Sequence, residues 1–291
     1  MSVPAGLFRF VQVELPWPLG PPDGRYLVRA PETVPAAPAS PPTHVLVFAT
    51  LGAPERRRLS GRRRQREVAP EPGPAAVATG RATVIDVGAP LSEAEAQAWL
   101  AGAGEEDLAA GLAVLNRALH AFRVVTADPH AHGVGRGQTL VARIGFGAGE
   151  EVAEGRWTAA KELSAPTGRQ RRSRVLAPQA QLAARLGARE ATLACEELTL
   201  RARADVEQGR SREAALQLLV ALDAALAELS ADPHAADLAE RLSALRGQRE
   251  PVGAAAQAAL VRPLSAEEEA AVAFALSRVE AALRARAAAA S

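Results

Sequence analysis

The first part of the chain alternates between short apolar runs and turn residues, which is the pattern of β-strands. The runs are rich in aromatic and β-branched residues and are bounded by turn residues such as Gly and Pro. Two stretches rich in Pro and Ala, 31–42 and 69–80, separate some of these runs and predict loops. We expect the strands at 7–15, 25–29, 43–50, 82–88 and 138–146.

Beyond residue 90 the apolar spacing changes to three and four residues, which is the helical period. Ser92 and Glu95 have the spacing of a capping box, in which each side chain bonds the other residue's backbone N–H. An apolar stripe follows through Leu108, Leu112, Leu115, Leu119 and Phe122. The pattern predicts helices within 92–123, and the composition of 150–163 predicts another that Gly155 weakens.

From about residue 175 to its end the chain has the helical period. The apolar stripes cover 191–206, 215–229, 238–245 and 272–283. The second of them runs through Ala215, Leu219, Leu222, Leu226 and Leu229. The short turn "EQGRSRE" between the first two stripes predicts an antiparallel helical hairpin. Ser265 and Glu268 form a second capping-box pattern before the last stripe.

The hairpin resembles a tetratricopeptide unit. Gly209 lies at the turn, and Ala202, Ala214 and Ala221 occupy positions where such repeats need a close approach of two helices. The run "GRSREAALQLLVALDAALAELSADPHAADLAERL" is also similar to the tetratricopeptide-like accessory segment of some bacterial transcriptional activators. The resemblance covers about a fifth of the chain and implies helical-hairpin packing only.

Together these patterns predict an α+β fold with two domains. Residues 1–165 should form a small, mostly antiparallel sheet with covering helices and with Pro/Ala- and Arg-rich loops. Residues 175–291 should form an all-helical domain with tetratricopeptide-like hairpin packing. A chain of 291 residues with 48% hydrophobic residues is long enough to bury such cores.

The amino-acid composition indicates the kind of genome that encodes the protein and the cellular compartment in which we expect it. Lys161 is the only lysine and Asn116 the only asparagine, which is typical of a GC-rich bacterial genome. The net charge of +1 is lower than a dedicated nucleic-acid binder usually carries. One cysteine excludes an internal disulfide, and neither a signal peptide nor a membrane-length apolar run is visible. We therefore expect a cytoplasmic protein without a membrane partner.

The segment "ADPHAHG" raises the question of a metal site. Asp128, His130 and His132 have a spacing similar to the first ligands of PHP and amidohydrolase metal sites. The chain holds five histidines in all, however, so later ligands are scarce. The motif "ADPH" also occurs twice, each time after a helical stripe, and in the second copy Asp232 and Pro233 fit a helix start. We favour a turn over a metal site and expect no cofactor.

Two other motifs have structural explanations that we favour. The glycine-rich "GFGAGEEV" could hold a phosphate, but its spacing fits neither a dinucleotide fingerprint nor a P-loop, and its two glutamates would repel an anion. Cys195 lies on an apolar stripe and should be buried and unreactive. Trp17, Trp99 and Trp157 are expected to anchor cores.

Two arginine runs are the candidate anion-binding segments. Seven arginines stand against two glutamates in 55–67, and "RQRRSR" adds four at 169–174. Neither run contains an aromatic residue to stack on bases, and charge runs are most often solvated. The residues are Arg56, Arg57, Arg58, Arg62, Arg63, Arg64, Arg66, Arg169, Arg171, Arg172 and Arg174.

The sequence favours a non-catalytic interaction or scaffold protein with an unidentified protein partner. Ala-rich helices with few aromatics, which make up only 3% of the chain, tend to expose shallow grooves suited to partner helices. Two alternatives stay open: a metal-dependent hydrolase that uses the "DPHAH" segment, and a binder of nucleic acid or another anionic partner through the arginine runs.

Overall fold

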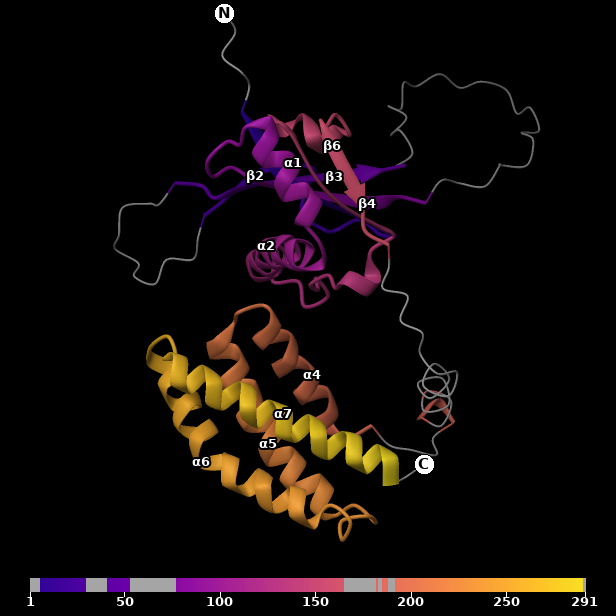
Figure 1. Ribbon diagram of the computed structural model, residues 1–291. Coiled ribbons are helices and arrows are strands. Elements are labelled where there is room, and N and C mark those ends of the chain that lie inside the picture. Colours follow the sequence, from indigo (N-terminus) through magenta and orange to yellow (C-terminus); the bar gives the residue numbers. More distant parts are fainter. Residues whose placement is uncertain are drawn as a thin grey trace, which may run out of the picture. The chain divides into compact units, whose positions relative to one another are not determined.

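The computed structural model describes residues 6–29, 41–52, 77–164, 182, 185–187 and 192–289. The chain divides into two compact units, Met1–Thr167 and Gly168–Ser291. In Figure 1 the first unit, here called the sheet unit, runs from indigo to magenta, and the second, the helical unit, is orange to yellow. The α+β class and the helical C-terminal half predicted from the sequence are confirmed.

The described part of the sheet unit contains one six-stranded sheet in which every pairing is antiparallel. Its strands lie in the order β2-β3-β4-β1-β5-β6, so the first strand of the chain is central. The strands are β1 Leu7–Leu15, β2 Gly24–Val28, β3 His44–Leu51, β4 Thr79–Asp86, β5 Val141–Ala148 and β6 Ala159–Glu162. The first five lie within three residues of the predicted strands.

One face of the sheet forms the main core of the unit with two helices. Val11 and Val13 of β1 point to this face and pack with α1 (Glu93–Gly102) and α2 (Glu105–Thr126). The α2 leucines of the predicted stripe are buried here, at no more than 7% exposure. The capping box at the start of α1 is confirmed, with Ser92 and Glu95 bonding each other's backbone N–H.

By length and composition alone, α2 could also cross a membrane. No membrane-length apolar run was predicted from the sequence. In this structure Leu108, Leu112, Leu115 and Leu119 of α2 are buried against the sheet. Burial in the core of the sheet unit therefore accounts for the apolar stripe formed by these leucines.

The opposite face of the sheet carries a polar ladder. The strand register places Gln12 between Thr83 and Arg143, and Glu14 beside Arg81. Gln12 Nε2 donates to Thr83 Oγ1 at 3.0 Å, and both side chains are at most 1% exposed. Glu14 Oε1 accepts from Arg81 at 2.9 Å and from Arg143 at 3.2 Å. Each buried polar group thus has a partner, which is the condition for a stable polar layer.

The predicted helix over 150–163 is wrong. The chain instead forms a 3-10 turn, η2 (Gly149–Glu154), which crosses the polar face, followed by the edge strand β6. Val152 is fully buried there, and its carbonyl accepts from Gln12 Nε2 at 3.4 Å. Gly155 adopts a φ of 87° and ends the turn. Tertiary pairing with β5 overrides the weak helical preference of this short segment.

The helical unit is an antiparallel bundle over residues 192–289. Its helices are α4 Ala194–Glu207, α5 Ser211–Ser230, α6 Ala239–Val261 and α7 Ala266–Ala289. The hairpin of α4 and α5 is confirmed, and Gly209 at its turn has a φ of 69°, a conformation that favours glycine. Because α7 contacts α4 and α5 as well as α6, the helices close around one core.

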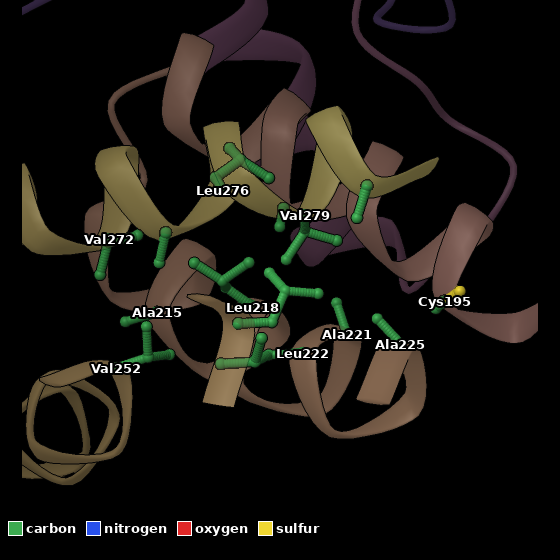
Figure 2. Packing of buried hydrophobic residues seen from close by; sticks show 14 of the residues in the cluster. Cys195, Ala215, Leu218, Ala221, Leu222, Ala225, Val252, Val272, Leu276 and Val279 are labelled. Atoms are coloured by element: carbon green, nitrogen blue, oxygen red, sulfur yellow. The ribbon is translucent and has the colours of Figure 1, made fainter. Parts of the chain in front are cut away.

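The bundle core is built from leucine, valine and alanine. Figure 2 shows Leu218 and Leu222 of α5 beside Leu276 and Val279 of α7, with alanines filling the closer approaches. Leu218 and Leu222 have no exposed surface, whereas Leu219 is only half-buried. The predicted α5 stripe had included Leu219 and passed over Leu218. Ala214, Ala221 and Ala225 share the buried face of α5 with Leu218 and Leu222.

Two arginines at the hairpin turn make structural contacts that the residue pattern does not predict. Arg210 pairs with Asp205 and Gln208, and only 17% of its side chain is exposed. Arg212 donates to the carbonyls of Ala259 and Leu260 at 2.5 and 3.3 Å, near the last turn of α6. These carbonyls lie at a helix end where a cation is favourable. Both arginines therefore tie the turn to its surroundings.

Candidate functional site

Both "ADPH" motifs fold as the same turn. The backbone N–H of His130 donates to Asp128 Oδ1 at 2.9 Å, and that of His234 donates to Asp232 Oδ1 at 2.9 Å. A short Asp side chain that accepts from a backbone N–H two residues on defines an Asx turn. The second copy was predicted to start a helix at Asp232. That prediction is wrong, because α6 begins only at Ala239. Local geometry therefore supports the turn interpretation in both places.

The same geometry bears on the metal hypothesis. Asp128 already uses one oxygen within its turn, and His130 and His132 are exposed. Among the described residues no group of three His, Cys, Asp or Glu side chains is arranged to hold a metal ion. A closed metal site needs ligands that converge from several elements, and in the described residues this turn brings together only its own side chains.

The arginine runs lie outside the described residues. Residues 55–67 and 169–174 fall within 53–76 and 165–181, so the structure places none of the candidate arginines. Anion binding by these runs stays a prediction. The glycine-rich segment, in contrast, is resolved: Gly145 and Gly147 lie in β5, where the returning η2–β6 segment packs directly on them. That contact leaves no space for a phosphate at these two glycines.

Cys195 is buried at the start of α4, as its place on the apolar stripe predicts. Burial raises the pKa of its thiol to about 12, and the adjacent Glu228 carboxylate adds to the effect. Glu228 also accepts from the backbone N–H groups of Ala194 and Cys195 at 3.0 and 2.9 Å, so α5 caps α4. A thiol held protonated in this way is a packing group and a poor nucleophile.

A cleft in the sheet unit gathers charged and polar side chains that the sequence analysis had not connected. It lies where α1 and α2 cross one end of the sheet, and its volume is about 200 Å³. Val11 and Val84 are among its apolar lining residues. The polar and aromatic lining comes from Arg9, His44, Asp86, Trp99 and Asp107.

Strand register explains why these side chains meet. His44 is paired with Asp86 across β3 and β4. Phe10 is paired with Ile85, so the preceding Arg9 of β1 lies next to Asp86 on the same face. Side chains of directly opposed residues on neighbouring strands lie close together. Three adjacent strands therefore bring a guanidinium, a carboxylate and an imidazole to one end of the sheet.

The helices complete the cleft with an aromatic wall. The Arg9 guanidinium carbon lies 5.2 Å from the centre of the Trp99 ring, within the range of a cation–π contact. Trp99 Nε1 donates to Asp107 Oδ1 at 3.2 Å, and the backbone N–H of Gly104 donates to Asp107 Oδ2 at 2.8 Å. Asp107 thus joins the end of α1 to the start of α2 and fixes the indole that holds Arg9.

The ionisation of His44 makes the stability of the folded protein depend on pH. Partial burial lowers the pKa of His44 below its ordinary value of 6.5; nearby Asp86 opposes this effect and Arg117 reinforces it. The folded protein therefore favours the neutral imidazole. The neutral His44 contributes fully to the free energy of unfolding at pH values above its pKa in the unfolded chain, about 6.5. This contribution is lost as the pH falls from there towards the lower pKa of His44 in the folded protein.

We expect His44→Gln to make the fall in stability between pH 7 and pH 5 shallower than in the wild type. Urea unfolding followed at a series of pH values measures this difference. The exposed His130→Gln is the matched control and should keep the wild-type slope. Equal slopes of stability against pH for the wild type and His44→Gln would contradict a lowered pKa of His44 in the folded protein.

Sequence reasoning missed this site for a definable reason. His44 begins β3 and Asp86 ends β4, and each lies within a predicted strand, but their encounter depends on the pairing of β3 with β4. Arg9 was part of a strand pattern that carries no chemical motif. Trp99 was expected as a core anchor and is half-buried, as is Trp157, whereas Trp17 is 40% exposed. The one signal in the sequence that could have indicated this site was a charged residue, Asp86, at the end of a strand.

Comparison with known proteins identifies no relative. No protein-family model matches the chain, and neither the curated proteins nor the solved structures include a significant match. The function must therefore be argued from the cleft itself.

Proposed function

We propose that this chain is a non-catalytic binding protein that holds a small polar ligand in the cleft at the end of the sheet. One observation carries the proposal. The Arg9 guanidinium makes no hydrogen bond and no ion pair with any described residue, and it lies against the Trp99 ring. The guanidinium is half-buried and keeps access to solvent, so its donors are available to an anionic group of a ligand.

The composition of the cleft suits the binding of a small molecule. Its lining contains no Ser, Thr, Cys or Lys, and its groups capable of acid–base chemistry are His44, Asp86 and Asp107. Both oxygens of Asp107 are engaged with Trp99 and Gly104. Small-molecule sites typically join apolar walls with a few convergent polar groups, and this cleft has that composition.

A protein partner and a cytoplasmic location, which the sequence favours, remain proposals. Leu216 and Val220 of α5 are 37% and 55% exposed on the outer side of the bundle, which supports a role of the helical unit in protein association. Isolated exposed apolar side chains are common on soluble proteins, so the cleft supports its proposal more specifically than this surface supports association.

The cleft proposal predicts that the protein retains a small metabolite through Arg9. Equilibrium dialysis against a bacterial small-molecule extract, followed by mass spectrometry, should show a compound enriched by the wild type. Arg9→Gln should lose about tenfold or more of this enrichment, because a charge-assisted hydrogen bond disappears.

Arg123→Gln is the matched control, because Arg123 lies on an exposed position of α2 outside the cleft lining. It should retain the compound as the wild type does. Enrichment that is equal in all three proteins, or that is absent from the wild type, would overturn the proposal.

The arginine runs allow a separate test of nucleic-acid binding. If they bind nucleic acid, the wild type should shift a DNA or RNA probe in gels, and the shift should weaken steeply with salt. Deletion of residues 55–67 should then reduce the shift while leaving the thermal melt nearly unchanged, because loop length changes chain entropy little. A wild type that shifts no probe at low salt would remove this alternative.

A further inference from the structure

We infer that the ligand of the cleft is a small zwitterion of the α-amino-acid type, whose carboxylate binds Arg9 and whose ammonium group binds Asp86. The inference rests on the proposed function and adds the chemical class of the ligand. It follows from three properties of the cleft: the pairing state of its two charged side chains, its size and its remaining polar groups.

Arg9 and Asp86 are neighbours that do not pair with each other. Their strands are adjacent and their side chains share a face, yet no ion pair joins them. Arg9 turns to the Trp99 ring, and Asp86 Oδ1 accepts from the backbone N–H of Gly88 at 3.0 Å. Asp86 Oδ2 has no hydrogen bond with a described residue. The cleft therefore presents a cationic group, Arg9, and an anionic group, Asp86, that do not form an ion pair with each other.

A ligand with a single charge would satisfy only one of these groups. A carboxylate alone would bind Arg9 but would also approach Asp86, and an amine alone would approach Arg9. A molecule that carries both charges on neighbouring atoms meets each group with its opposite. Charge-assisted hydrogen bonds are roughly twice as strong as neutral ones, so this complementarity favours the zwitterion at both ends.

The size of the cleft favours a small ligand. Its volume of about 200 Å³ lies below the range of about 300–1,000 Å³ that drug-sized ligands occupy. A free amino acid with a short side chain is of a size that such a cleft can hold.

The other polar groups of the lining have partners within the protein. Each oxygen of Asp107 accepts one hydrogen bond, from Trp99 Nε1 and from the Gly104 backbone N–H, while the carboxylate keeps its negative charge. His44 favours its neutral form, and its Nδ1 lies 2.9 Å from Thr43 Oγ1. A neutral imidazole can contact the ligand without adding charge. Arg9 and Asp86 are thus the charged groups of the lining with side-chain atoms that no described residue engages.

Isothermal titration calorimetry on the full chain tests the inference, with the short-chain amino acids as first probes. L-Alanine is the reference compound, and propionate and ethylamine are its carboxylate-only and amine-only counterparts. We expect at least one short amino acid to bind about tenfold or more tightly than its two counterparts. Arg9→Gln and Asp86→Asn should each weaken that binding by about tenfold or more, while Arg123→Gln should not.

Circular dichroism melts of each variant show whether it is folded, and Arg9→Lys, which keeps the charge, serves as a second variant. It should bind more tightly than Arg9→Gln. Propionate that binds as tightly as alanine, or binding that Asp86→Asn leaves unchanged, would overturn the zwitterion assignment. Failure of all the amino acids to bind would overturn it too. In each case an Arg9-dependent compound in the dialysis experiment would leave the proposed function standing.

Discussion

Replacing Leu222 by Asp should unfold the helical unit. Leu222 has no exposed surface and lies at the centre of the bundle, with Leu218 one turn before it. An aspartate there would be a buried charge without a partner, which costs several kcal/mol. A small domain has a total stability of only about 5–15 kcal/mol, so this cost removes most or all of it. Circular dichroism melts of the full chain measure the loss, because most of the described helix lies in 192–289.

Val220→Asp is the matched control on the same helix. Val220 is 55% exposed, so an aspartate there stays in contact with water and should change stability by about 0.5 kcal/mol or less. The two variants introduce the same side chain two residues apart on one helix. A Leu222→Asp protein as stable as Val220→Asp would mean that α5 does not pack as described, and the bundle would have to be abandoned.

The strands and helix ends were predictable because their signals are local. Alternating apolar residues and turn residues located five strands, and the Ser-x-x-Glu spacing located the starts of α1 and α7. The hairpin turn at Gly209 was also a local signal. Such patterns express preferences of a few adjacent residues, which a single sequence carries in full.

The incorrect predictions concern segments whose structure is determined by tertiary contacts. Residues 159–162 have no strong strand preference and become β6 only because β5 offers an edge. In α5 the buried face includes Ala214, Ala221 and Ala225 beside Leu218 and Leu222. A stripe drawn through the leucines gave too little weight to these alanines, and it therefore included Leu219 and omitted Leu218.

The candidate site illustrates the same limit. The motif that attracted attention, "DPHAH", is a turn whose hydrogen bonds are made within itself. The groups that converge come from Arg9, His44 and Asp86, which are far apart in the sequence and adjacent only through the order of β3, β4 and β1. Register in a sheet built from distant strands is not encoded locally. The site could be found only after that order was known.

Gly145 provides the sharpest test of how the edge strand is held. A Cβ atom added there would collide with the backbone oxygen of Ala159, and it would lie 2.7 Å from Ala160 Cβ and 2.8 Å from Phe10 Cε1. Since Ala159 is the register partner of Phe146, neither strand can yield without breaking the β5–β6 ladder. We therefore expect Gly145→Val to separate β6 and η2 from the sheet.

The expected cost of Gly145→Val is about 1–3 kcal/mol, the usual cost of overpacking a core. Strand preference alone predicts the opposite sign, because valine is favoured over glycine in strands on a scale of about 1 kcal/mol. Gly137→Val is the control: a Cβ atom at Gly137 meets no atom within 4 Å, and its φ is not positive. Urea unfolding followed by tryptophan fluorescence is suited to the comparison, because Trp157 packs against Phe10 with ring centres 5.6 Å apart. A Gly145→Val protein that is more stable than the Gly137→Val control would show that β6 does not lie against Gly145, and the sheet would then end at β5.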